Sequence, residues 1–152
     1  LTRRKDRLVL GVSRIVHSST ELGQAIRQAL SALELGSRVT GRASPHWYDD
    51  LGLYRVLSDL RDRDELHRFY RETLGSLLQY DEEHGAELVH TLQVFFEQNA
   101  NASQAARALY VHRNTLNYRL QRIVEISGCD LDDADTRLTL QLALKLHRLM
   151  VS

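Results

Sequence analysis

The sequence predicts a mainly α-helical protein that contains a helix-turn-helix, preceded by a small strand–helix–strand segment. Two observations lead to this fold class. From residue 49 onward, apolar side chains recur every three or four positions, which is the spacing of helices that bury one side. Before that point, residues 8–12 form a short continuous apolar run, which is typical of a buried strand. At 152 residues the chain is long enough for one domain and part of another.

The N-terminal segment begins with a basic lead-in, residues 2–7. A solvated approach to the strand is the preferred interpretation of it, and an arm that contacts DNA is the alternative. A helix is expected next, with a capping box over residues 18–21 and an end at Gly36. Residues 46–48 form a candidate second strand after Pro45. One strand–helix–strand unit cannot close a sheet by itself, so it is interpreted as a piece of a larger α/β domain.

The helix-turn-helix is predicted over residues 101–123. Its first helix starts at Asn101, a favourable N-cap, and Gln104 three residues later completes the pattern of a capping box. Ala105 and Ala106 are small enough to let two helices cross closely at a steep angle. The connection at Tyr110 is too short for anything but a tight turn, and it contains no glycine.

The second helix of this motif restarts near His112. Four apolar residues are expected on its buried side, Leu116, Leu120, Ile123 and Val124. Its other positions carry arginine, asparagine, glutamine, threonine and tyrosine, whose polar groups fit base edges and phosphates. Four arginines in or near this segment contrast with 20 basic and 20 acidic residues in the whole chain. A helix that reads DNA is therefore preferred over an ordinary solvated helix.

These residues carry a family resemblance. Residues 109–116, Leu-Tyr-Val-His-Arg-Asn-Thr-Leu, then Tyr-Arg-Leu at 118–120, closely resemble the C-terminal DNA-binding domain of PucR/CdaR-type bacterial transcriptional regulators. The helix-turn-helix is also similar to the Fis type, whose turn lacks glycine. The N-terminal segment resembles the tail of a degenerate GGDEF-like domain, although the signature itself is absent and no cyclase chemistry is inferred. The resemblance implies a GGDEF-like α/β remnant over residues 1–48 and a PucR-type DNA-binding domain over 49–152.

The resemblance also implies a function, that of a cytoplasmic, sequence-specific transcriptional regulator that binds double-stranded DNA. The recognition helix, about residues 112–125, would enter the major groove. The candidates for base contacts are His112, Arg113, Asn117, Tyr118 and Gln121, and those for phosphate contacts are Ser103, Thr115, Arg119 and Arg122. One alternative is a Fis-like architectural protein that binds DNA with little sequence preference. The other is a helical protein-interaction module that no longer binds DNA. Effector sensing is expected in missing upstream sequence.

The final helix, about residues 133–150, is apolar on two sides. One side carries Leu138, Leu142, Leu146 and Leu149, and Leu140 and Leu144 lie nearly opposite. The first side can close the core of the helix-turn-helix. The side of Leu140 and Leu144 is expected to be buried by a neighbouring helix or by a second subunit, and a homodimer is the expected assembly.

Several kinds of chemistry lack a sequence signature. The seven histidines are scattered, and the acidic runs at residues 81–83 and 130–135 fit helix starts and caps better than a calcium loop. No metal site and no cofactor are therefore predicted. There is no nucleotide-binding fingerprint, so an enzyme is not expected. The single cysteine, Cys129, suits a reducing cytosol, and no apolar run approaches the length of a membrane span.

Overall fold

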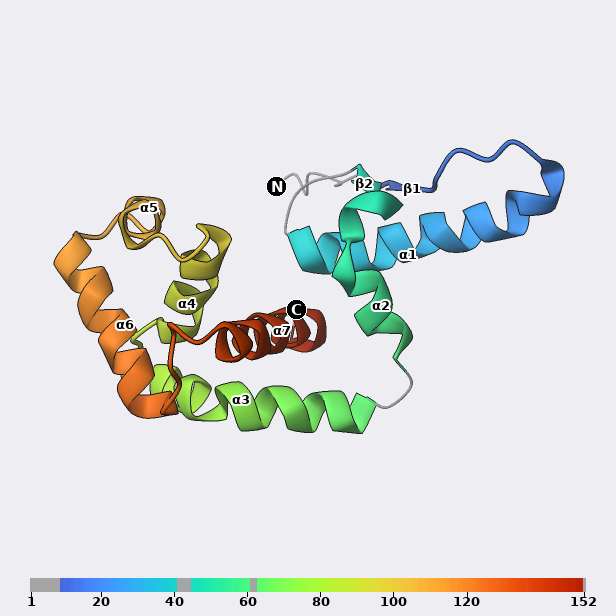
Figure 1. Ribbon diagram of the computed structural model, residues 1–152. Coiled ribbons are helices and arrows are strands. Elements are labelled where there is room, and N and C mark those ends of the chain that lie inside the picture. Colours follow the sequence, from blue (N-terminus) through green and yellow to red (C-terminus); the bar gives the residue numbers. More distant parts are fainter. Residues whose placement is uncertain (1–8, 41–44, 61–62, 152) are drawn as a thin grey trace, which may run out of the picture. The chain divides into compact units, whose positions relative to one another are not determined.

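The computed structural model describes residues 9–40, 45–60 and 63–151. The basic lead-in and the first residue of the predicted strand, Leu8, lie outside these residues. Figure 1 shows a chain built mainly from helices with one small sheet, which confirms the predicted fold class. The chain divides into two compact units. Unit 1 comprises Leu1–Arg61 with Arg148–Ser152, and unit 2 comprises Asp62–His147.

The division between the units does not coincide with the boundary after residue 48 that the sequence predicts. It falls between residues 61 and 62, because helix α2 (Leu53–Asp59) packs with helix α1 (Leu22–Thr40) in unit 1. The division describes how the chain packs. The origin of each segment in a particular family is a separate matter and stays a prediction.

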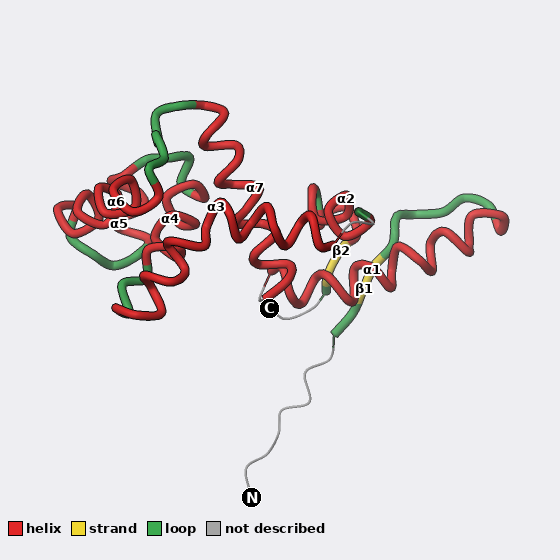
Figure 2. Tube along the Cα trace, turned by 90° about the horizontal axis from the view of Figure 1, so that it is seen from below, coloured by secondary structure: helices red, strands yellow, loops and turns green. Residues whose placement is uncertain are grey.

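Unit 1 is a strand–helix–strand unit. Strands β1 (Gly11–Val12) and β2 (His46–Trp47) pair in parallel, with Gly11 opposite His46. In Figure 2 the two yellow strands lie beside α1, which connects them and is preceded by a short 3-10 helix, η1 (Ser19–Glu21). The core of this unit is formed by Ala32 and Leu35 of α1 and by Leu51 of a second 3-10 helix, η2 (Tyr48–Leu51).

Helix α1 does not end at Gly36, as the sequence predicts, but continues through it to Thr40. Glycine is needed here for another reason, the close approach of β2 to the helix at this point. A Cβ atom added to Gly36 would come within 2.3 Å of Cγ of His46, so only glycine fits. Gly36 therefore acts as a contact point for the buried His46 ring and not as a helix stop.

Unit 2 contains five helices within the described residues. They are α3 (Arg63–His84), α4 (Leu88–Glu97), α5 (Ala102–Ala108), α6 (Arg113–Ser127) and α7 (Ala134–Val151), of which the last turn belongs to unit 1. Fully buried leucines and one isoleucine form its core: Leu74, Leu77, Leu88, Leu92, Leu116, Ile123, Leu140 and Leu146. Helix α6 contacts α3, α4 and α5, so three helices support it from behind.

The link between α3 and α4 is held by Asp81. The acidic run at residues 81–83 belongs to the end of α3, and not to a helix start as predicted. The carboxylate of Asp81 accepts hydrogen bonds from the backbone N–H groups of Leu88 and Val89, at 2.7 and 2.9 Å. It thereby satisfies two free donors at the start of α4, where a negative charge is favourable.

Helix α7 crosses α3, and the rings of His147 and Tyr70 lie 5.7 Å apart at the crossing. The prediction that Leu140 and Leu144 are buried is confirmed, since 0% and 7% of their surfaces are exposed. Their burial comes from this chain alone. Neither leucine is therefore available to form the two-fold interface that was the alternative, and Leu138 on the other side is 66% exposed.

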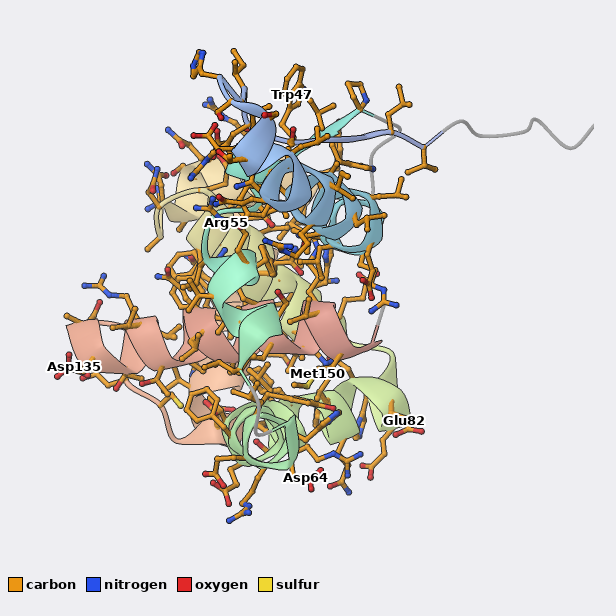
Figure 3. All side chains as sticks on the ribbon, turned by 90° about the vertical axis from the view of Figure 1, so that its right-hand side faces the viewer. Trp47, Arg55, Asp64, Glu82, Asp135 and Met150 are labelled. Atoms are coloured by element: carbon orange, nitrogen blue, oxygen red, sulfur yellow. The ribbon has the colours of Figure 1, made fainter. Side chains whose placement is uncertain are left out.

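The second acidic run caps α7. The carboxylate of Asp133 accepts a hydrogen bond from the backbone N–H of Thr136 at 2.7 Å, as expected of a helix cap. Hydrogen bonds from the side chain and backbone of Thr136 lower the pKa of Asp133 below its usual value. Asp135 follows in the first turn of α7 and is labelled there in Figure 3.

Candidate nucleic-acid interface

Helix α5 begins at the N-cap that the sequence predicts. The side-chain oxygen of Asn101 accepts hydrogen bonds from the backbone N–H groups of Ser103 and Gln104, at 3.0 and 3.1 Å. In a complete capping box, the side chain of Gln104 would accept a hydrogen bond from the N–H of Asn101. Here that N–H donates to the carbonyl of Gln98 instead. Ala105 and Ala106 are buried, which lets α5 lie close to α4 and α6. The side chain of Ser103 is exposed.

The turn between α5 and α6 places Tyr110 in the left-handed region, at φ 56°. The sequence predicts a turn without glycine here, and the structure confirms it. Two backbone hydrogen bonds fix the turn, from Tyr110 N–H to the carbonyl of Arg107 and from Val111 N–H to that of Ala106. A left-handed residue other than glycine costs roughly 1–2 kcal/mol, yet the Tyr110 side chain gains no burial in exchange, since the residue is 97% exposed.

Helix α6 starts at Arg113, and His112 is its N-cap. The Nδ1 atom of His112 accepts a hydrogen bond from the N–H of Asn114 at 3.2 Å, which requires the tautomer with its proton on Nε2. Leu116 and Ile123 are fully buried, as predicted. Val124 is not buried but 37% exposed, because one step beyond Ile123 turns a side chain about 100° around the helix.

The side of α6 that faces away from the core is polar. All five candidates for base contacts are exposed: His112, Arg113, Asn117, Tyr118 and Gln121. Thr115, a candidate for a phosphate contact, is exposed as well. Asn114 belongs to the same surface and was not selected from the sequence. Its carboxamide offers the same paired donor and acceptor as Asn117, which was the signal available.

Two arginines that the sequence assigns to phosphates point elsewhere. Arg119 donates hydrogen bonds to Thr91 Oγ1 at 3.0 Å and to a carboxylate oxygen of Glu87 at 3.3 Å, both on the α4 side. Arg122 donates to the hydroxyl of Tyr80 in α3 and to Glu125, and its guanidinium lies 5.0 Å from the centre of the Tyr80 ring. Hydrogen bonds to Tyr80 and then to Glu125 hold the pKa of Arg122 above its usual value.

The polar side of α6 changes character along its length. Its C-terminal part carries the acid Glu125, whose carboxylate accepts hydrogen bonds from Gln121 at 3.1 Å and from Arg122 at 2.9 Å. Its first two turns carry a cation, amides and hydroxyls. Arg113 attracts a phosphate backbone, whereas the charges of Glu125 and Arg122 largely cancel, so the N-terminal half of α6 is the part better suited to nucleic acid.

The helices that build this surface match a known family. Residues 88–146, which run from the start of α4 into α7, match the PucR C-terminal helix-turn-helix domain. This segment belongs to that family. The match includes α4, α5 and α6 in full, so the exposed side of α6 is part of the PucR-type domain.

Relatives extend the similarity over most of the chain. The proline-responsive transcriptional activator PutR of Bacillus subtilis is 33% identical over 143 residues, which are 93% of this chain and 34% of PutR. The purine catabolism regulatory protein of the same organism is 34% identical over 96% of this chain and 27% of its own length. The carbohydrate diacid regulator of Escherichia coli is 34% identical over 82% of this chain and 32% of its own length. The expected resemblance to PucR/CdaR-type regulators is thus confirmed.

The chain spans about a third of the length of the curated relatives that it matches. Among solved structures, a regulator of polyketide synthase expression from Bifidobacterium adolescentis aligns with a TM-score of 0.48 and 25% identity. That alignment covers 90% of this chain and 52% of the other.

Metal sites and membrane spans each have features that can be recognised in the part of the chain that the structure describes. Across residues 9–40, 45–60 and 63–151, no three histidine, cysteine or acidic side chains come together as metal ligands. Within the same ranges, every helix is too short or too polar to cross a membrane. Cys129 is a free thiol that is partly buried beside Ser127.

Proposed function

We propose that this chain is the DNA-binding part of a sequence-specific transcriptional regulator of the PucR/CdaR type. The observation that carries the proposal is the arrangement of α6. Directly after the turn it presents Arg113, Asn117 and Tyr118 on one exposed side, while Leu116 and Ile123 fasten the opposite side to the core. Relatives that cover most of this chain are named as transcriptional activators and regulators, which supports the same function.

In the proposed complex, the first two turns of α6 enter the major groove of double-stranded DNA. In helix-turn-helix proteins the N-terminal residues of the recognition helix contact base edges. Arg113 fits the two acceptors of guanine, and Asn117 fits the donor and acceptor of adenine. His112 presents Nε2, because Nδ1 is used in the cap, and Tyr118 follows within the second turn of α6. Gln121 is the weakest candidate for a base contact, because its side-chain amide already donates a hydrogen bond to Glu125.

The phosphate contacts are proposed for the hydroxyls of Ser103 and Thr115. Both side chains are exposed, one near the start of α5 and the other in the first turn of α6. Arg107 on α5 is exposed as well and adds a positive charge beside the turn. Arg119 and Arg122 are left out of this set, because their guanidinium groups are engaged with α4 and α3.

Two other functions use the same fold. A Fis-like architectural protein would bind DNA of any sequence, and an interaction module would bind none. Selection of duplexes from a randomised pool by the full 152-residue chain separates the three. We expect one enriched sequence, bound with an affinity that falls steeply between roughly 50 and 200 mM salt. Binding without enrichment would indicate the architectural protein, and the absence of binding would indicate the interaction module.

The proposal extends to the protein as a whole. Because this chain covers only about a third of the length of its relatives, effector sensing is assigned to sequence upstream of it. We expect the protein in the bacterial cytoplasm, where its proposed DNA partner would lie, and the proposal requires no cofactor and no catalytic step. A homodimer remains part of the proposal, since two recognition helices about 34 Å apart would read a two-fold symmetric site. Sedimentation of the full-length protein tests it, and a monomer at micromolar concentration would contradict it.

Residues 1–48, which lie in unit 1, are proposed to be the C-terminal remnant of a GGDEF-like α/β domain. The parallel pairing of β1 with β2 through α1 supports this, because parallel pairs occur in larger sheets. Leucine and isoleucine side chains also remain exposed along α1, at Leu22, Ile26 and Leu30. Such a surface is expected where further elements of an α/β domain pack.

A further inference from the structure

Helices α4 and α6 are joined by a polar link whose centre is buried. Thr91 in α4 has no exposed surface, and its hydroxyl donates to the carbonyl of Glu87 at 2.7 Å. A lone pair of the same oxygen accepts a hydrogen bond from Arg119 at 3.0 Å. A second nitrogen of Arg119 lies 3.3 Å from the Glu87 carboxylate. The Arg119 side chain is only 21% exposed, so this link lies under the surface of α6.

The link fixes α6 in a way that its apolar contacts do not. Leu116 and Ile123 attach the helix to the core, but contact between apolar groups has little directional preference. Hydrogen bonds depend strongly on distance and angle. Arg119 lies between those two apolar residues along the helix and next to Tyr118. Its two bonds therefore add a directional restraint on the rotation of α6 about its axis, and thus on where the polar side points.

We infer that Arg119 is a positioning residue for DNA recognition, which acts through Thr91 and Glu87 and does not itself hold a phosphate. The inference rests on the proposed function of α6. Arg122 makes a comparable connection to α3 through Tyr80, and the two arginines thereby tie the recognition helix to two of the three helices behind it. Tyr80 directly precedes Asp81, whose carboxylate caps α4, so the same short segment of α3 supports both helices.

The test is a double-mutant cycle in the full 152-residue chain. Arg119→Met keeps the side-chain stem, and Thr91→Val keeps the shape of the buried residue while it removes the hydroxyl. The probes are the duplex that the unsubstituted chain selects from a randomised pool and a scrambled duplex. Affinities are calculated per folded protein, with circular dichroism as the measure of folding. Arg71→Met, on the exposed side of α3, is the control for loss of one positive charge.

We expect Arg119→Met to weaken binding to the selected duplex by roughly three- to thirtyfold, and to change binding to the scrambled duplex much less. The salt dependence should stay the same, because no phosphate contact is lost. Thr91→Val should have a similar effect, and the double variant should be no weaker than either single one. Arg71→Met should bind as the unsubstituted chain does.

Two results would overturn the inference. A phosphate contact would show as a salt slope reduced by about one on both duplexes, with losses that add to those of Thr91→Val. A purely structural role would show as unchanged affinity per folded molecule.

If the unsubstituted chain binds no DNA, the proposed function fails, and hydrogen exchange still tests the link. Arg119→Met must then lower the protection of the α6 amides but not of the α3 amides, and equal protection in α6 would refute it.

Discussion

The Nδ1 atom of His112 accepts a hydrogen bond from the backbone N–H of Asn114, 3.2 Å away, so one side chain both caps α6 and borders its exposed side. Two substitutions separate these roles. His112→Asn retains a good cap without the ring, whereas His112→Ala removes both and should lower the free energy of unfolding by about 1 kcal/mol. Urea denaturation measures this difference.

The same pair of variants tests base contact by His112. If the ring reads a base, both variants should weaken binding to the selected duplex by similar factors, in a fluorescence anisotropy titration. Full affinity of His112→Asn would show that the residue is a cap only, and would remove it from the base-facing set.

Tyr110 combines a left-handed backbone with an almost fully exposed ring. Tyr110→Gly should raise the free energy of unfolding by up to about 1 kcal/mol, because glycine adopts this conformation without strain. Because its ring is almost fully exposed directly before the recognition helix, we expect Tyr110 to contact DNA, so the same variant should bind DNA more weakly.

Tyr110→Ala is the control, because it removes the ring and keeps the strain. It should lose DNA affinity as Tyr110→Gly does, without the gain in stability. If Tyr110→Gly is more stable and binds DNA at full strength, the tyrosine has no part in recognition.

Leu138 and Leu140, two residues apart on α7, should respond differently to shortening. Leu140 is fully buried, and Leu140→Ala should lower the free energy of unfolding by about 2–5 kcal/mol. Leu138 is mostly exposed, and Leu138→Ala should change it by less than about 0.5 kcal/mol. Equal effects in chemical denaturation would contradict the orientation of α7.

His147 should make the protein sensitive to mild acid. Burial lowers the pKa of its ring from the usual 6.5, and its Nδ1 atom has no hydrogen-bond partner among the described residues. As the pH falls, the unfolded chain therefore takes up the proton before the folded chain does. The stabilisation is present above pH 6.5 and is lost as the pH falls through the folded pKa.

The measurement for His147 is the thermal midpoint at about pH 7.5 and about pH 5.5. His147→Phe keeps an aromatic ring against Tyr70 and cannot titrate. On acidification, the thermal midpoint of the unsubstituted chain should fall further than that of this variant. Identical losses would assign the acid sensitivity to other groups.

The features that the sequence predicts well depend on local chemistry. The cap at Asn101 and the turn at Tyr110 each arise from one residue and its immediate neighbours. The buried positions Leu116 and Ile123 follow from the helical period. These features are sufficient to place the helix-turn-helix and the exposed base-facing candidates.

The features that the sequence misses depend on distant partners. A glycine is typical of a helix stop, but Gly36 instead leaves room for the side chain of His46. The hydrogen bond between Arg119 and Thr91 joins residues 28 positions apart, which only the fold brings together, so the sequence could not predict it. Leu140 and Leu144 were assigned to a buried side correctly, but periodicity cannot tell a neighbouring helix from a second subunit.

The central claim is that Arg113, in the first turn of α6, reads a base edge in the major groove. Arg113→Ala should cost roughly 1–3 kcal/mol on the selected duplex and much less on a scrambled one. The most direct measurement replaces each guanine of the selected duplex in turn by 7-deazaguanine, which lacks the N7 acceptor. At one guanine the replacement should weaken binding of the unsubstituted chain and leave that of Arg113→Ala unchanged. If the replacement costs both proteins the same at every guanine, Arg113 does not read a guanine N7 and the account of recognition is wrong.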